Sequence, residues 1–388
     1  MAGLYIHIPF CRSKCAYCDF FSLPLDKTLK ETRHEIMRRY CVAVLAEFKS
    51  RRHEINENFE TVYIGGGTPT VIPDDILLPF ISSVKALVTS DSNHLREFTI
   101  EANPEDITPA YINNLKEAGI DRISIGIQSF DSRQLHYISR KHDAETSLGA
   151  LKILHDSGVN YSADLIYGLP GQSIKDWQKQ LETLLSFTPP HFSAYLLSYE
   201  PGTKLYVRRE KGFVNETDEE TASRMYQVLT EIASKYGYHH YEISNFALPG
   251  HEAVHNSSYW NLTPYLGLGC SAHSFDGSMR RINPLNLRQY LTSILGDPPH
   301  TVFITEPETI VNKLNDYIIT SLRTSSGLSL SQAETIGGSD LKSYLIANLS
   351  KEIAKDNLIE TDGRVRIPEN LWLTADSILR EVIVDPTE

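Results

Sequence analysis

Short runs of alternating apolar and polar residues recur along the first half of the chain, separated by stretches with helical spacing. Such alternation indicates a β-strand, because successive side chains point to opposite faces. The intervening stretches are long enough for crossover helices, and strands joined in this way pair in parallel. The predicted strands are Leu4–Phe10, Thr61–Gly66, Phe98–Asn103, Arg122–Ser129, Tyr161–Tyr167 and His191–Ser198. We therefore expect an α/β fold with six βα units in a partial barrel.

The two faces of these strands differ. In Arg122–Ser129 three isoleucines share one face, whereas Ser124, Gly126 and Gln128 share the other. A closed barrel of eight units fills its interior with bulky aliphatic side chains. Here the residues expected inside include Tyr5, His7, Glu101, Gln128 and Asp164. This pattern favours a wider or open barrel around a polar ligand; the alternative is a set of internal polar networks that satisfy one another.

From about Glu306 the pattern changes to helices followed by a hairpin. Helical spacing covers 311–323 and 341–355, and Asp362-Gly363 between two alternating runs predicts a two-residue turn. With a last helix over 371–382, this part is typical of a winged-helix-like α+β domain. The predicted division is a barrel domain at 1–245, a linker or site-covering segment at 246–304 and a C-terminal domain at 305–388.

Composition narrows the class of protein. The 388 residues are enough for two domains, with 41% hydrophobic and 22% charged residues. A net charge of −12 argues against a nucleic-acid partner, also for the acidic C-terminal domain. The sequence contains no apolar run of the roughly 18 residues that a membrane span needs, and its start does not resemble a signal peptide. We expect a cytoplasmic protein without a transmembrane segment.

Three of the five cysteines lie close together, at Cys11, Cys15 and Cys18, in a C-x3-C-x2-C spacing. Thiolates are soft ligands, and runs of this kind hold iron–sulfur clusters. A [4Fe–4S] cluster takes four ligands, so three cysteines leave one iron open. The alternatives are a three-cysteine zinc site or chance clustering. We interpret Cys41 as a core residue and Cys270 as a small buried residue, with a ligand role for Cys270 left open.

Candidate ligand-binding residues follow the predicted strands. The run from Gly65 to Thr70 contains three glycines whose backbone suits an amino-acid head group. Glu101 and Asp164 lie within apolar strands and require a cation or a donor there. Arg140 could pair with a carboxylate or simply be a solvated arginine at a helix end. Further along, Tyr259 and Trp260 could pack against a flat aromatic ligand, with His255 or His273 as a metal ligand, but from the residues alone a packed loop is the favoured interpretation.

Five sequence strings together resemble one radical S-adenosylmethionine (SAM) subfamily, which contains oxygen-independent coproporphyrinogen III oxidases and haem chaperones. They are Tyr5–Cys11, Cys11–Phe20, Gly65–Thr70, Gly126–Phe130 and Asp164–Pro170. The resemblance implies a partial (β/α)6 radical-SAM barrel in which Cys11, Cys15 and Cys18 bind a [4Fe–4S] cluster. The residues that it places against SAM are Tyr5, Gly66, Gly67, Thr68, Glu101, Gln128, Arg140 and Asp164.

Three features separate the branches of this subfamily. The oxidases carry a further cysteine where this chain has Phe20, and they carry an N-terminal extension that we do not expect here. The string from His255 to Trp260 is similar to the H-N-x-x-Y-W motif of the haem-chaperone branch. That branch implies haem binding, with His255 as a haem contact, and delivery of haem to haem-dependent proteins. A flavodoxin- or ferredoxin-type electron donor is a further expected partner.

Three rival functions stay open at this point. The first is coproporphyrinogen III oxidation, which Phe20 argues against. The second is another radical SAM enzyme with a substrate that the sequence does not identify. The third is a binding protein that uses its cluster only as a redox sensor. Whether SAM cleavage belongs to the function is likewise left open.

Overall fold

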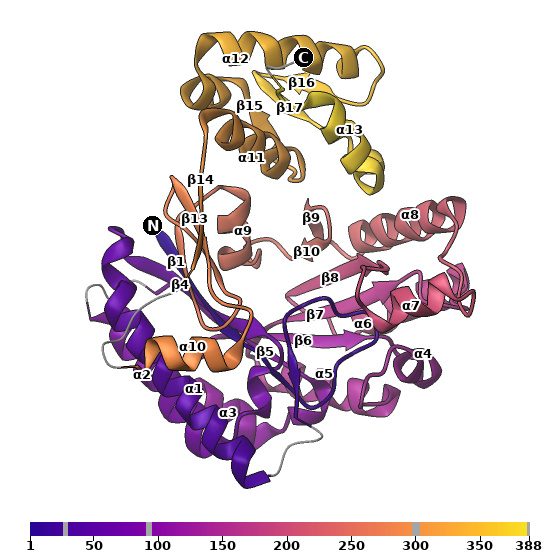
Figure 1. The fold of residues 1–388 in the computed structure, drawn as a ribbon. Coiled ribbons are helices and arrows are strands. Elements are labelled where there is room, and N and C mark those ends of the chain that lie inside the picture. The colour runs from indigo at the N-terminus through magenta and orange to yellow at the C-terminus, as the bar shows by residue number, and fades with distance from the viewer. Residues whose placement is uncertain (26–29, 91–94, 297–302, 386–388) are drawn as a thin grey trace.

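The predicted strands form the centre of one curved sheet (Figure 1). The structure, a computed structural model, describes residues 1–25, 30–90, 95–296 and 303–385. The six strands of the βα units are β1 Ala2–Ile8, β4 Phe59–Gly66, β5 Glu97–Ala102, β6 Arg122–Gln128, β7 Asn160–Tyr167 and β8 His191–Leu196. They pair in this order and all in parallel. The predicted α/β fold with a partial barrel of six units is confirmed.

Helices cover the outer face of these strands, because the apolar side chains point outward. Ile123, Ile125 and Ile127 of β6 are fully buried there. The helices of the βα units are α1 Lys30–Arg51, α2 Asp74–Thr89, α3 Pro109–Ala118, α4 Ser132–Tyr137, α5 Ala144–Ser157 and α6 Ile174–Leu185. The helix α3 ends at Gly119, whose φ of 116° provides the left-handed cap. Among the described residues, no helix is both long and apolar enough to cross a membrane.

Shorter strands extend the sheet beyond both edges of the barrel. β11 Tyr265–Leu268 pairs in parallel with β1, and β12 His273–Phe275, β13 Met279–Ile282 and β14 Ile304–Pro307 follow antiparallel. At the other edge, β10 Asn245–Ala247 and β9 His239–Glu242 add to β8. The segment 246–304 thus contributes strands to the sheet, which the sequence did not indicate. The division of the chain at 245 and 304 stays a prediction.

The barrel part of the chain also contains further helices, short strands and 3-10 turns. They are β2 Phe10–Cys11, β3 Leu23–Pro24, α7 Lys204–Glu210, α8 Glu219–Lys235, α9 Val254–Trp260, α10 Leu287–Ile294 and the 3-10 turns η1 Arg52–Glu54, η2 Pro69–Val71 and η3 Pro104–Asp106. Of these, α9 matters most for the site. It packs against β1 and β4 at the end of the barrel where the strands begin.

The C-terminal part forms a separate layer above the sheet in Figure 1. It consists of α11 Ile310–Leu322, β15 Leu328–Ser329, α12 Leu330–Ile353, β16 Ile359–Thr361, β17 Arg364–Arg366, η4 Glu369–Thr374 and α13 Ala375–Val382. The predicted hairpin is present, and Asp362 and Gly363 both have positive φ, as a two-residue turn of this type requires. Backbone hydrogen bonds from Ser325 to Tyr241 and from Ile243 to Arg323 join this part to the barrel.

Candidate functional site

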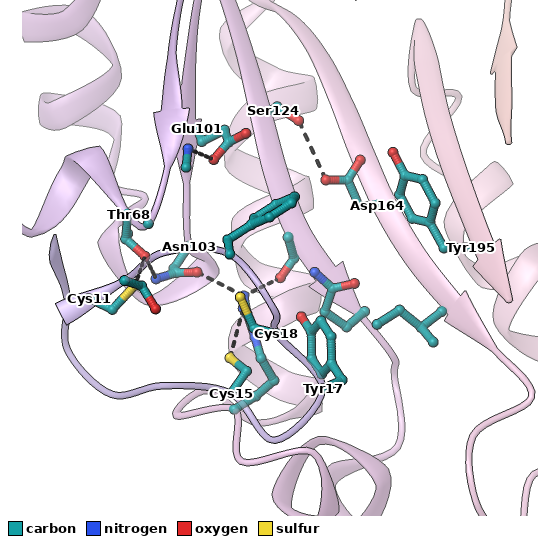
Figure 2. A pocket seen from close by; sticks show the side chains of 18 of the residues that line it. Cys11, Cys15, Tyr17, Cys18, Thr68, Glu101, Asn103, Ser124, Asp164 and Tyr195 are labelled. Atoms are coloured by element: carbon teal, nitrogen blue, oxygen red, sulfur yellow. Dashed lines mark hydrogen bonds between the residues drawn. The ribbon is translucent and has the colours of Figure 1, made fainter. Parts of the chain in front are cut away.

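A cavity of about 470 Å³ lies inside the barrel, and its walls come from the strands and from the cysteine loop. All of the predicted cluster and SAM residues except Tyr5 line this cavity. Figure 2 shows the cysteines on one side, with Glu101, Asp164 and Tyr195 further along the walls. The structure therefore brings together residues from strands and loops that lie far apart in the sequence.

The cysteine loop follows β1 and is held by backbone hydrogen bonds. The N–H of Ala16 donates to the carbonyl of Ile138 at 2.9 Å, and the N–H of Leu205 donates to the carbonyl of Ala16 at 2.8 Å. Because Ala16 is fully buried, the loop is pinned at its middle while the three cysteines, all free and half-buried, stay at the cavity wall.

Two cysteine sulfurs have hydrogen-bond donors beside them. Thr68 Oγ1 lies 3.8 Å from Cys11 Sγ, and Arg140 Nη1 lies 3.6 Å from Cys15 Sγ. Burial raises the pKa of the Cys11 thiol, and it raises the pKa of Cys18 to about 11. Thiols in this state lose their protons when a metal binds, because the metal stabilises the thiolate.

The donor set fits an iron–sulfur cluster. Three soft sulfur ligands come from one loop, open onto one cavity, and stand next to groups that donate toward thiolates. Within the described part of the chain, no three His, Cys, Asp or Glu side chains converge as ligands of a single ion. A cluster does not need such convergence, since each cysteine binds a different iron.

The glycine turn after β4 runs directly beside the cysteine loop. The N–H groups of Gly67 and Thr68 donate to the carbonyls of Ile8 and Phe10, both at 2.7 Å. Gly66 has a φ of 104°, and a Cβ there would lie 2.4 Å from the His7 ring. Only glycine allows this close approach of the two segments.

Glu101 on β5 is held by two donors. Its carboxylate accepts from Tyr63 OH at 2.8 Å and from the N–H of Gly66 at 2.9 Å. Burial nevertheless raises its pKa to about 7, although both hydrogen bonds act in the opposite direction. A cationic group entering the cavity would lower this pKa again, so the site favours a ligand with a positive charge.

Asp164 on β7 is the second buried carboxylate of the cavity. Ser124 Oγ lies 3.5 Å from its carboxylate, and burial raises its pKa. Two carboxylates with raised pKa values in one cavity indicate a ligand that supplies charge or hydroxyl donors.

Arg140 is tied to the end of β6 rather than exposed to solvent. Its Nη2 donates to the carbonyl of Gly126 at 2.6 Å and to Asn103 Oδ1 at 2.8 Å. Asn103 Nδ2 in turn donates to Thr68 Oγ1 at 3.3 Å. Gln128, at the end of the same strand, has a φ of 67°, where the pairing with β7 shifts register. This chain of contacts links the glycine turn to the cysteine loop.

Two predicted site residues lie outside the cavity lining. Tyr5 donates or accepts at His7 Nδ1, 3.0 Å away, and its ring stacks on Tyr63. His255 on α9 is fully buried, with Nδ1 2.8 Å from Thr61 Oγ1 and Nε2 2.9 Å from Tyr259 OH. Both ring nitrogens of His255 are therefore engaged in hydrogen bonds. The proposed roles of Tyr5 and His255 stay predictions.

The remaining cysteines are core residues. Cys41 on α1 is 4% exposed, as predicted, and burial raises its pKa to about 12. Cys270 is fully buried, with its sulfur 2.9 Å from the carbonyl of Pro284. Neither lines the cavity. The structure thus separates the three loop cysteines from the other two.

Comparison with known proteins decides the family. Residues 5–184 match the family model of the radical SAM superfamily. The chain is 32% identical to the haem chaperone HemW of Bacillus subtilis over 365 residues, which are 92% of this chain and 93% of that protein. The chain belongs to the HemW family of radical SAM proteins. The haem chaperone HemW of Lactococcus lactis is also 32% identical, over 98% of this chain and 97% of its own.

The fold of this HemW family member is shared with a solved radical SAM enzyme. Coproporphyrinogen III oxidase (HemN) from Escherichia coli superposes with a TM-score of 0.80 over 99% of this chain and 90% of that chain, at 20% identity. At this identity the likeness establishes the fold alone. Membership of the superfamily implies a [4Fe–4S] cluster and SAM as cofactors.

Sequence reasoning missed several residues of the cavity. Asn103, Arg122, Ser193 and Tyr195 line it, and so does Asn256, the neighbour of His255. One signal was available for Arg122, because the alternation that places Ser124, Gly126 and Gln128 inside the barrel also places Arg122 there. Asn256 belongs to the H-N-x-x-Y-W string, but only the packing of α9 under the barrel shows that it lines the cavity.

Proposed function

We propose that Cys11, Cys15 and Cys18 hold a [4Fe–4S] cluster with one open iron, and that SAM binds beside it in the same cavity. The shared loop, the free thiols and their position at the cavity wall support this assignment. When bound, a reduced cluster supplies the electron for reductive cleavage of SAM.

The surrounding residues position SAM in this proposal. Glu101, held by Tyr63 and Gly66, offers a carboxylate to a cationic or hydroxyl group. Gly66 and Gly67 line the cavity, and in this proposal their backbone receives the amino-acid head group. Thr68, Gln128, Arg140 and Asp164 complete the wall, and Tyr5 supports it from behind through its stacking on Tyr63.

We further propose that the protein is a cytoplasmic haem chaperone, which binds haem and delivers it to haem-dependent proteins. The similarity to HemW proteins over more than nine-tenths of the chain carries this proposal. The side chain of Phe20, where the oxidases have a further cysteine, lines the cavity. His255 is the proposed haem contact, and it must leave its partners Thr61 and Tyr259 to bind iron.

The test is an anaerobic haem titration of protein with a reconstituted cluster, followed by mixing with an apo-globin. We expect stoichiometric haem binding, transfer to the globin, and no decarboxylation of coproporphyrinogen III. Decarboxylation without tight haem binding would contradict the chaperone function and indicate a coproporphyrinogen III oxidase. A triple Cys11→Ser, Cys15→Ser, Cys18→Ser variant should lose the iron, whereas Cys41→Ala, in the core, should keep it.

A further inference from the structure

A buried arginine with two unpaired nitrogen atoms lies at the deep end of the cavity. Arg122 is the first residue of β6, is 1% exposed, and lines the cavity with its side chain. Its Nε and Nη2 atoms have no hydrogen-bond partner among the described residues. Removing a charged group from water without a compensating partner is strongly unfavourable, so such a group in a cavity indicates a missing anion.

The polar side chains of His191 and Glu97, near Arg122, form hydrogen bonds with other groups. His191 has Ser162 Oγ at 2.6 Å from Nδ1 and Tyr241 OH at 2.7 Å from Nε2. The carboxylate of Glu97 accepts the backbone N–H groups of Val254 and His255 at 2.7 and 3.1 Å. The hydrogen bonds of both side chains therefore go to groups other than the guanidinium.

Asp164 lines the same cavity at a level further along the strands. Burial raises the pKa of its carboxyl, and the positive charge of Arg122 acts to lower that pKa without an ion pair between the two side chains. The strand register pairs Asp164 with Gly126, whereas Arg122 pairs with Asn160. Four residues along a strand separate these levels by about 13 Å. The carboxylate of Asp164 is bonded to Ser124 rather than to Arg122.

A second buried arginine, by contrast, has hydrogen-bond partners for its guanidinium. Arg51 is also 1% exposed, yet it donates to the carboxylates of Glu47 and Glu54, to Ser274, and to the carbonyl of Gly267. The fold can thus supply partners for a structural arginine. Their absence at Arg122 favours a ligand-binding role.

Arg122 lies far from the cluster end of the cavity. β6 spans seven residues from Arg122 to Gln128, or about 20 Å between their Cα atoms. The cysteine loop and the glycine turn follow the ends of their strands, so an amino-acid head group bound there does not reach Arg122. α9, which carries His255 and Asn256, closes the end where Arg122 lies, and Asn256 also lines the cavity.

We propose that Arg122 binds a carboxylate of a second ligand, distinct from the carboxylate of SAM, at the amino-terminal end of the barrel strands. A guanidinium recognises a carboxylate through paired, charge-assisted hydrogen bonds. The identity of the ligand rests on the proposed function: the ligand is haem, and the carboxylate is one of its propionates. The haem site then includes the barrel end between Arg122 and α9.

Haem and haem dimethyl ester, which lacks free carboxylates, are the probes for this proposal. Wild-type protein with its cluster should bind haem about tenfold to a hundredfold more tightly than the ester. Arg122→Met should bind both equally, Arg122→Lys should retain part of the preference, and Arg133→Met, at an exposed helix position, should behave as wild type. A preference for haem that survives in Arg122→Met would overturn the proposal, as would an equally large loss of SAM affinity in that variant.

Thermal unfolding of the ligand-free protein separates this proposal from the haem function. Arg122→Met should melt at the wild-type temperature or above it, because it removes a buried charged group in which two nitrogen atoms have no hydrogen-bond partner. Arg51→Met should melt well below it. A lower melting temperature for Arg122→Met would show a structural role and overturn the proposal. If wild-type protein binds no haem, the haem function fails, and this comparison still decides whether Arg122 is an unsatisfied ligand-binding cation.

Discussion

At the scale of single residues, burial in the cavity changes the protonation of Glu101. Its carboxylate accepts from Tyr63 and from Gly66, yet burial raises its pKa to about 7 from an ordinary value of 4.5. The folded protein therefore holds a proton on Glu101 between these two pH values, where the unfolded chain has released it. A cationic ligand reverses this preference, which ties the charge of Glu101 to occupation of the site.

This difference predicts a pH-dependent effect of Glu101→Gln on the free energy of unfolding. Because the folded state binds the proton more tightly, the contribution of Glu101 to stability falls as pH rises from about 4.5 to 7. Between pH 5 and pH 8 the variant should gain about 1–3 kcal/mol relative to wild type. Urea denaturation of ligand-free protein measures this. The exposed Glu117→Gln should show no such gain, and an equal gain in both variants would contradict the prediction.

Gly66 gives a second prediction at this scale. Its φ of 104° and the 2.4 Å approach to His7 leave no room for a Cβ. Gly66→Ala should lower the free energy of unfolding by about 1–3 kcal/mol and weaken SAM binding. Gly149→Ala on α5, where nothing lies within 4 Å, is the matched control and should be neutral or slightly stabilising. Unchanged SAM affinity in Gly66→Ala would contradict the assigned role of the turn.

At the scale of elements, a buried polar network docks β11–β13 onto the barrel. Glu47 and Arg51 on α1 are almost fully buried and lie 2.7 Å apart. Glu47 accepts from the N–H of Gly269 and from Tyr290 OH, and Asn283 donates to it at 2.7 Å. The first helix of the chain thereby fixes the strands beside β1, and through them the edge of the sheet.

Breaking this pair from one side should be costly. Arg51→Met leaves the Glu47 carboxylate buried without its cation, so we expect a loss of about 3–5 kcal/mol in the free energy of unfolding. The double variant Glu47→Leu, Arg51→Met should lose less, because no uncompensated charge remains. Urea denaturation of the single and double variants tests this, and additive losses would show that the two residues act independently.

At the scale of the whole molecule, the barrel interior has two chemically different ends. The three cysteines and the glycine turn lie where the strands end, and Arg122 and α9 lie where the strands begin. The C-terminal part joins the barrel near the second end, through Tyr241 and Ile243. A ligand at each end can therefore be held at the same time.

This arrangement predicts that SAM does not displace haem. The dissociation constant for haem should change by less than about threefold when SAM is saturating, since the two ligands share no contact residue in the proposal. An anaerobic haem titration with and without SAM, on protein with its cluster, measures the effect. Competition between the two would place both ligands at the cluster end of the cavity.

The sequence alone determined the parts of this protein that depend on local patterns. Alternation along Arg122–Ser129 and its five counterparts predicted the strands, because one face of each strand packs on helices while the other lines a polar cavity, which leaves a period of two. The spacing of Cys11, Cys15 and Cys18 predicted a single ligand loop, and Asp362-Gly363 predicted the hairpin turn. Most of the predicted cavity residues followed from their positions at strand ends.

Only the tertiary structure decided which distant residues contact one another. The strands β11–β13 join the sheet because β11 pairs with β1. One ring nitrogen of His255 is hydrogen-bonded because Thr61 lies beside it. The side chains of Glu97 and His191, near Arg122, form their hydrogen bonds with other groups. None of these contacts follows a local sequence pattern, because each joins residues tens to hundreds of positions apart. Their outcome depends on which partner satisfies each buried polar group, and that is settled only when the whole chain is packed.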